Sequence, residues 1–165
     1  MRLETRSEST DPSAQRSAPR GCTNFKLRQL LRVVSRLYDV ELAKAGLKTT
    51  QFSLLSHLAV TSPVQPGELA LRMDMDASTL TRNLRVLAEQ GWAVQGPGAD
   101  ARSRLIEITS AGRQKVSQAR RHWKSAQLTL NARLGAPQVA ALHRLIDYGL
   151  EQLRVNEPAE SAQRN

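Results

Sequence analysis

The chain has 165 residues, a formal net charge of +9, an ordinary apolar content of 40% and few aromatic residues, 4% of the total. Such a length suits one domain with a sizeable core. The apolar content excludes a membrane protein and a wholly disordered chain. The scarcity of aromatic residues favours a core built from helices. The excess of Lys and Arg serves solubility, but it also favours a polyanionic partner such as nucleic acid.

The chain opens with a polar segment. Residues 1–21 are rich in Ser, Arg, Pro, Glu and Thr, which predicts a disordered arm, and residues 156–165 predict a flexible tail. The arm lacks the apolar stretch of a secretion signal, and no run reaches the ~18 apolar residues of a membrane span. We therefore expect a cytoplasmic protein without a membrane partner.

A long amphipathic helix is predicted next. Apolar residues recur at helical spacing from Phe25 to Leu42, Thr23 or Asn24 can cap the start, and Gly46 stops the helix. A helix of this length with such an apolar face needs a partner to cover it.

Three shorter helices follow. Thr49 or Thr50 is predicted to cap the second helix, which ends before Pro63, and Pro66 marks the start of a short third helix. Asp76 caps the fourth, which Gly91 closes.

Two short strands are predicted at residues 92–95 and 104–108, with the turn-rich sequence GPGADARS between them. Thr109 then caps a long helix to about Leu134, and a last helix follows the break at residues 135–137. The order predicts a mainly α fold with a small β-hairpin wing, a winged helix-turn-helix. In a helix-turn-helix the second helix enters the major groove of DNA.

The fourth helix carries the candidate reading surface. Leu80, Leu84 and Leu87 share one face, so we expect them to be buried. The other faces carry hydroxyl and guanidinium groups suited to phosphates and base edges: Ser78, Thr79, Thr81, Arg82 and Arg85. A solvated surface helix would show the same pattern, and it is the hairpin after it that favours DNA.

At the tip of the hairpin, an exposed Arg102 or Arg104 suits the narrow, electronegative minor groove. Asp100 alone would repel phosphate, so we expect it to pair with a nearby Arg and hold the wing in shape.

The positive charge is unevenly distributed. The segment from Pro66 to Arg104, which contains the fourth helix and the tip of the hairpin, has five basic and five acidic residues. This segment, the reading module, therefore carries no net charge. The surplus lies in the first and fifth predicted helices: Lys26, Arg28, Arg32, Arg36, Arg113, Lys115, Arg120, Arg121 and Lys124.

At these residues the chain resembles the MarR family of bacterial regulators. The stretches LTRNLRVLAEQGWAV, DARSR and ITSAG follow the family's layout of recognition helix, wing tip and start of the next helix, in order and at the right spacing. The resemblance covers roughly residues 23–153.

The resemblance implies a homodimer. Residues 22–48 and 110–155 would form its dimerisation helices, and residues 49–109 its winged helix-turn-helix DNA-binding domain. Two recognition helices related by a two-fold axis imply a palindromic operator on double-stranded DNA, with half-sites ~34–36 Å apart.

Carried over by position, the resemblance assigns contacts of the recognition helix to Ser78, Thr81, Arg82 and Arg85. It assigns entry into the minor groove to Arg102 and a structural role in the wing to Asp100. Gln95 and Gly96 stand where the family often has an Arg after the first strand, so a phosphate contact is in doubt there.

The resemblance also implies repression released by a small phenolic or aromatic carboxylate ligand. The candidates for binding it are Arg28, Arg32, Tyr38 and His57, because Arg can clamp a carboxylate and Tyr or His can contact a ring. Each of them taken singly is also an ordinary surface or dimer-interface residue.

Cys22 raises an alternative, an oxidant-sensing repressor, because one branch of the family has a reactive Cys at the start of its first helix. Here Cys22 lies two residues before the position matching that branch. As the chain's single Cys, it cannot form an internal disulfide.

Other classes find less support. The three histidines, His57, His122 and His143, fall on separate predicted helices, and no catalytic motif or metal-ligand spacing is present. We therefore expect neither an enzyme nor a bound metal or cofactor. A winged helix used only for protein contacts is the remaining alternative.

Overall fold

The computed structural model describes residues 20–98 and 103–154 and confirms the predicted order of elements. The elements are α1 (Thr23–Leu42), the 3₁₀ turn η2 (Ala43–Ala45), α2 (Thr49–Thr61), α3 (Pro66–Arg72), α4 (Ala77–Glu89), β1 (Ala93–Pro97), β2 (Arg104–Ile108), α5 (Ser110–Leu134) and α6 (Ala136–Arg154). The fold is mainly helical, with a two-stranded antiparallel sheet.

The chain divides into two compact units between Val33 and Val34, within α1. The described residues of the first unit are the start of α1, where Phe25, Leu27 and Leu31 are all exposed. All the other elements belong to the second unit.

The core of the second unit is aliphatic, as the composition predicts. Its largest fully buried side chains are all leucines: Leu42, Leu54, Leu55, Leu58, Leu69, Leu80 and Leu87. The aromatic residues Tyr38 and Phe52 join them in the core. The ring of Phe52 also stacks on that of the more exposed Trp123, with the ring centres 6.3 Å apart.

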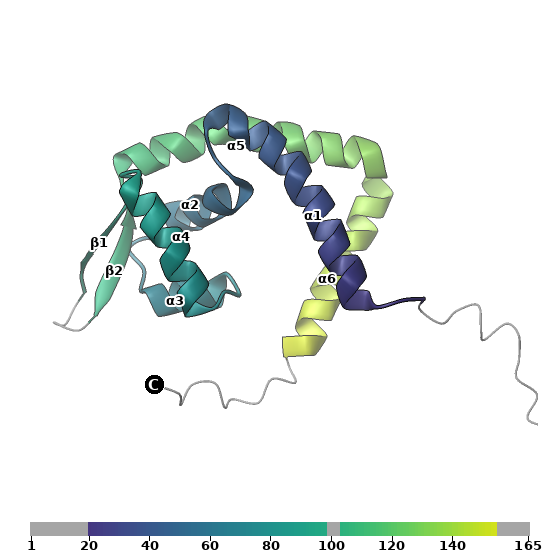
Figure 1. The fold of residues 1–165 in the computed structure, drawn as a ribbon, viewed down its shortest axis with the longest axis horizontal. Coiled ribbons are helices and arrows are strands. Elements are labelled where there is room, and N and C mark those ends of the chain that lie inside the picture. The colour runs from purple at the N-terminus through teal and green to yellow at the C-terminus, as the bar shows by residue number, and fades with distance from the viewer. Residues whose placement is uncertain (1–19, 99–102, 155–165) are drawn as a thin grey trace, which may run out of the picture. The chain divides into compact units, whose positions relative to one another are not determined.

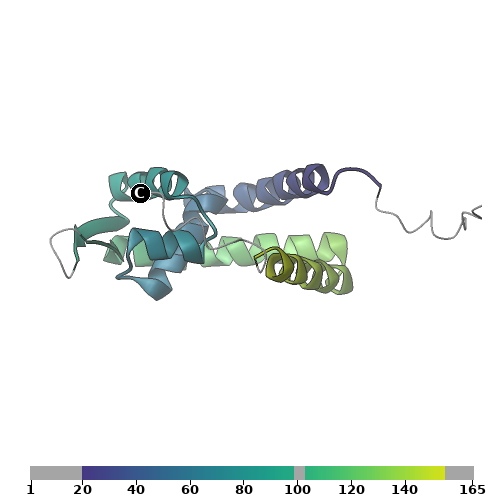
Figure 2. The same ribbon diagram turned by 90° about the horizontal axis from the view of Figure 1, so that it is seen from below.

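Helix α2 lies between α4 and α5 and contacts both of them (Figure 1). The view turned by 90° shows α5 passing behind the short helices (Figure 2). The residues of α5 that are buried, Gly112, Val116, Ala119 and Ala126, give it a small-residue face, which allows α2 to pack closely.

The helix ends follow local signals with one exception. Gly46 takes the left-handed conformation, with a φ of 67°, and ends the first helical segment as predicted. The prediction that a Thr caps α2 is wrong. Thr49 is the first helical residue, and its backbone N–H and hydroxyl both donate to Oδ1 of Asp39, each over 2.7 Å.

Helix α6 leaves large apolar side chains exposed, among them Leu145, Tyr148 and Leu153. An exposed apolar face of this kind suits contact with another protein surface. No described helix is long and apolar enough to cross a membrane.

Candidate nucleic-acid interface

A tight turn joins α3 to α4. The N–H of Asp74 donates to Leu71 O and that of Met75 to Ala70 O, over 3.2 and 2.9 Å, which is the hydrogen-bond pattern of a Schellman helix end. Asp74 occupies the left-handed position of this motif, with a φ of 54°. Its carboxylate pairs with Arg154 at the end of α6, with 2.9 Å between Oδ2 and the guanidinium.

Asp76 caps α4, as predicted. Its Oδ1 accepts from the backbone N–H of Thr79 over 2.7 Å and from the hydroxyl of Ser78 over 2.6 Å. These hydrogen bonds, that from Ser78 foremost, hold the pKa of Asp76 well below its usual range. The carboxylate thus fixes the end of α4 that carries the predicted contact residues.

The inner face of α4 packs as predicted. Leu80 and Leu87 are fully buried, and Leu84 is half-buried. Four of the five predicted contact residues are exposed, and Thr79 is half-buried: Ser78, Thr81, Arg82 and Arg85.

The exposed residues differ in what they contact. Thr81 donates its hydroxyl to Ala77 O over 2.7 Å, and Nε of Arg85 donates to Glu89 over 2.8 Å. Within the described residues Arg82 has no ion-pair partner. Its guanidinium can therefore bind an acceptor from outside, whereas Arg85 must exchange or share its contact with Glu89.

The hairpin begins directly after α4. Its register pairs Ala93 with Ile108 and Pro97 with Arg104, and a bridge between Val64 and Ile106 attaches it to the segment before α3. Arg104 is exposed on β2. The predicted tip residues Asp100 and Arg102 lie outside the described residues.

The junction between the wing and α5 explains the glycine of the ITSAG stretch. The hydroxyl of Thr109 accepts from Gly112 N over 3.0 Å, capping α5, and donates to Gly91 O over 2.7 Å. A Cβ added to Gly112 would lie 2.2 Å from the carbonyl oxygen of Trp92. Helix α5 can pass this close to the wing only with Gly at that position.

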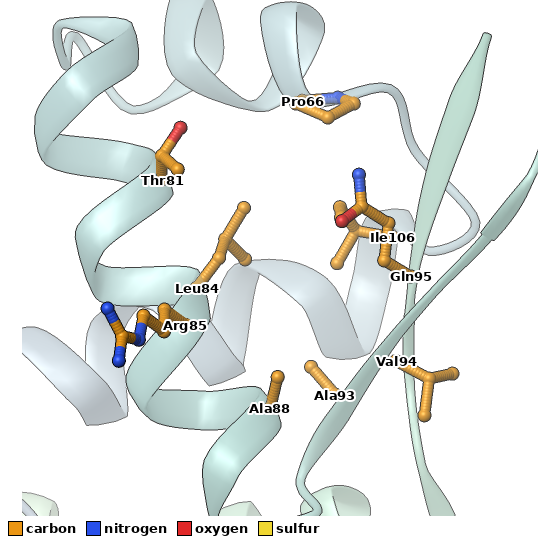
Figure 3. Close-up of a pocket in the computed structure, with 9 residues that line it drawn as sticks. All are labelled: Pro66, Thr81, Leu84, Arg85, Ala88, Ala93, Val94, Gln95 and Ile106. Atoms are coloured by element: carbon orange, nitrogen blue, oxygen red, sulfur yellow. The ribbon is translucent and has the colours of Figure 1, made fainter. Parts of the chain in front are cut away.

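A cavity of about 300 Å³ lies between α4 and the wing (Figure 3). Leu84, Ala88, Ala93 and Ile106 give it an apolar wall, and Gln95 from β1 adds a polar group. Arg85 and Val94 line its edge, with their side chains pointing away from it. Sequence reasoning missed this cavity, because it arises where a helix and two strands pack imperfectly, and sequence patterns place these elements one at a time. Its size and lining suit a small, partly apolar ligand.

The predicted ligand residues fall in both units, Arg28 and Arg32 in the first and Tyr38 and His57 in the second. Tyr38 is buried, and its hydroxyl donates to Oε1 of Gln127 over 2.5 Å. Burial raises the pKa of Tyr38. His57 is half-buried, with Nδ1 2.8 Å from Ser53 O.

Cys22 is exposed and directly precedes α1, where its carbonyl accepts from Lys26 N over 3.1 Å. Oxidant sensing by this thiol stays a prediction. In the described ranges no three His, Cys, Asp or Glu side chains cluster as a metal site would require.

A family model described as the MarR family matches residues 45–103, which include α2, the helix-turn-helix and the wing. The chain belongs to the MarR family. All the predicted residues of the recognition helix lie inside the match, and α5 and α6 lie beyond it.

The relatives of this MarR-family chain are described as regulators. It is 27% identical to the HTH-type transcriptional regulator YwoH of Bacillus subtilis over 93 residues, 56% of this chain and 68% of YwoH. It is 33% identical to an HTH-type transcriptional regulator of Mycobacterium tuberculosis over 87 residues, 50% of this chain but only 61% of that protein.

Two solved structures extend the likeness over more of the chain. The M. tuberculosis regulator MosR in complex with DNA is 32% identical, with a TM-score of 0.70, over 81% of this chain and 99% of MosR. A mutant of Escherichia coli MarR in complex with operator DNA is 25% identical, with a TM-score of 0.72, over 77% of this chain and 92% of MarR. The fold is thus that of MarR-family winged-helix regulators.

Proposed function

We propose that this MarR-family protein is a dimeric transcriptional regulator that binds a palindromic operator, with residues 49–109 as its DNA-binding domain. The observation that carries the proposal is the exposed polar face of α4, which follows a helix-turn-helix and precedes an antiparallel hairpin. MosR and MarR, which share this fold, were solved bound to DNA. Repression follows if the dimer blocks polymerase at a promoter.

In this proposal Ser78, Thr81, Arg82 and Arg85 contact DNA from the major groove, and the wing contacts the minor groove. Arg82 reads a base because its guanidinium lacks an internal partner among the described residues, and Arg can donate two hydrogen bonds to guanine. Ser78 and Thr81, whose hydroxyls already donate to Asp76 and to Ala77 O, keep lone pairs that accept from a donor on a base.

The Arg82→Ala variant tests this assignment. We expect it to lose ~1–3 kcal/mol on the operator and much less on unrelated duplexes, because a base contact carries sequence information. Fluorescence anisotropy with both DNAs at one salt concentration measures the difference. Lys48→Ala, which removes an exposed cation outside the recognition helix, is the matched control.

A uniform loss over all sequences would assign Arg82 to phosphate contacts. Unchanged DNA binding in Arg82→Ala would favour the alternative, a winged helix that contacts only proteins.

We further propose that a small aromatic carboxylate releases the operator, and that it binds the cavity between α4 and the wing. The apolar wall suits a ring, and Arg85 at the edge of the cavity suits a carboxylate. To bind it, the guanidinium must turn from Glu89 towards the cavity, because Figure 3 shows it pointing away. A ligand there would favour the arrangement of α4 and the wing in which the cavity is open. It would weaken operator binding only as far as it binds this arrangement more tightly than the DNA-bound one.

Benzoate binding to the DNA-free protein, followed by calorimetry, tests the site. We expect Arg85→Gln to weaken binding at least tenfold and Arg32→Gln to leave it unchanged. The opposite result would place the ligand at the residues predicted from sequence, and a wild type that binds no benzoate would overturn the proposal.

A further inference from the structure

The charged residues of helix α5 are all positive. Its 25 residues include no Asp or Glu, but they include six cations: Arg113, Lys115, Arg120, Arg121, Lys124 and Arg133. Lys115 is half-buried with its ammonium 5.1 Å from the centre of the Trp92 ring, so it already has a partner.

Four of the cations share one side of the helix. With 3.6 residues per turn, Arg113, Arg120, Arg121 and Lys124 fall within an arc of about 100° and along roughly 16 Å of the axis. All four are exposed. Arg113 also donates to Ala59 O over 2.9 Å, a contact that leaves its charge unopposed. We call these four cations the α5 basic face.

Acidic groups near α5 are engaged elsewhere. Helix α2 contains no acidic or basic residue other than His57. On the last turn of α1, Asp39 accepts from Thr49, and Glu41 lies 2.6 Å from Lys44 and 4.0 Å from His122.

The acids of α6 do not balance the face either. Helix α6 carries Asp147 and Glu151 together with Arg144 and Arg154, so it has no net charge apart from its histidine. Within residues 20–98 and 103–154 no ion pair joins a member of the α5 basic face to a carboxylate. The positive charge of the face is therefore available to a partner.

Helix α2 separates the α5 basic face from the recognition helix, because α2 contacts both α4 and α5 (Figure 1). Helix α5 meets α2 where Arg113 donates to Ala59 O and where the ring of Trp123 stacks on that of Phe52. The four cations are centred roughly 110° around the α5 axis from the buried Gly112, Val116 and Ala119, and Arg113 is the member that reaches α2. With α2 between the two helices, these cations are not part of the exposed face of α4.

The chemistry of the face favours phosphate over a lipid surface. Between Arg113 and Lys124 the uncharged residue on this arc is the exposed Ser117, and one apolar residue, the exposed Leu128, follows a turn after Lys124. An interfacial membrane helix would accompany its cations with a continuous exposed apolar face, which a single Leu does not provide. Arg, Lys and Ser are the side chains that contact a nucleic-acid backbone.

We propose that the α5 basic face binds the phosphate backbone of a second segment of duplex DNA while the recognition helices hold the operator. The protein then bridges two duplexes, or two distant parts of one. The inference goes beyond the proposed function and rests on it for the first duplex only. It also gives a role to the surplus positive charge of the chain, which lies outside the electrically balanced reading module.

A bridging assay with the full chain tests the proposal. Biotinylated operator duplex is immobilised with saturating protein, and a fluorescent duplex of unrelated sequence is the probe for the second site. We compare wild type with the variant R120Q/R121Q/K124Q and with the control K48Q/R133Q/R144Q, which removes three exposed cations elsewhere. Operator binding and oligomeric state of each protein are measured in parallel.

We expect wild type and control to capture the second duplex and R120Q/R121Q/K124Q to lose at least tenfold in capture while still binding operator. The slope of log K against log salt for the second duplex should fall by about 2.7, which corresponds to three phosphates at about 0.9 each.

Equal capture by R120Q/R121Q/K124Q and wild type would overturn the proposal, as would a wild type that binds operator but captures no second duplex. Binding to vesicles rich in anionic lipid in place of DNA would overturn it in favour of a membrane surface. Failure of operator binding itself in the wild type would instead count against the proposed function, so the two failures are distinguishable.

Discussion

At the scale of single residues, a close backbone contact restricts which amino acid a position can hold more strictly than burial does. Gly112 is the clearest case, because a Cβ there would meet the carbonyl oxygen of Trp92 at 2.2 Å. The motif Thr-x-x-Gly after the wing thus has a steric reason, the close passage of α5 over the end of the hairpin. Gly149, in α6, has open space around it and offers a contrast.

We predict that Gly112→Ala lowers the free energy of unfolding by about 1–3 kcal/mol, because backbone must shift to admit the methyl group. Gly149→Ala should raise it by about 0.5–1 kcal/mol through helix propensity. Urea denaturation followed by circular dichroism measures both. A Gly112→Ala protein as stable as wild type would show that α5 does not pass the wing this closely.

The residues that would bind a ligand are harder to predict from the sequence. The hydroxyl of Tyr38 donates to Gln127, a partner 89 positions away, and no local pattern reveals such a contact. The same reason hid the cavity beside Arg85, whose wall comes from α4 and both strands. Hydrophobic periodicity predicts which face of a helix is covered, but it does not predict how completely the covering elements fill the space.

At the scale of elements, the predictions succeeded where the signal is local. Asp76 and Thr109 cap α4 and α5 through their own side chains, and Gly46 takes the left-handed conformation that ends a helix. They failed where the partner is distant, as with Asp39, whose carboxylate serves the start of α2. The first strand begins at Ala93, one residue later than predicted.

The reason for that shift lies in the end of α4. The N–H of Trp92 donates to Leu87 O over 2.9 Å and completes the helix end, while its carbonyl accepts from Thr109 N over 3.0 Å, next to the hairpin. Sequence patterns place a helix end and a following strand separately, and they do not assign the residue that both could use.

The cap of α4 predicts a pH dependence. The pKa of Asp76 is lowered in the folded chain relative to the ordinary value of 3.8. Its carboxylate therefore contributes stability that is present above about pH 4 and is lost as the pH falls towards the folded-state pKa. Denaturation at about pH 6 and about pH 3 should show the advantage of wild type over Asp76→Ala shrinking at the lower pH.

Asp76→Ser separates capping from titration, because a serine hydroxyl can accept from Thr79 N without carrying a charge. Its advantage over Asp76→Ala should stay the same at both pH values. An advantage of wild type over Asp76→Ala that does not change with pH would contradict the assignment of the cap to the ionised carboxylate.

At the scale of the whole molecule, the distribution of charge and of exposed apolar surface separates the parts by role. The segment from Pro66 to Arg104 carries balanced charge, α5 carries a basic face that has no ion-pair partner among the described residues, and α6 exposes Leu145, Tyr148 and Leu153. A second copy of the chain would cover the apolar residues and duplicate the recognition helix. Two copies related by a two-fold axis require an operator with the same symmetry.

Selection from a random pool of double-stranded DNA, with sequencing of the fraction bound at moderate salt, tests this account most directly. We expect a palindrome whose half-sites are centred about 10–10.5 base pairs apart. A folded, dimeric protein that enriches no sequence motif would contradict it and would leave a winged helix that contacts other proteins as the better explanation.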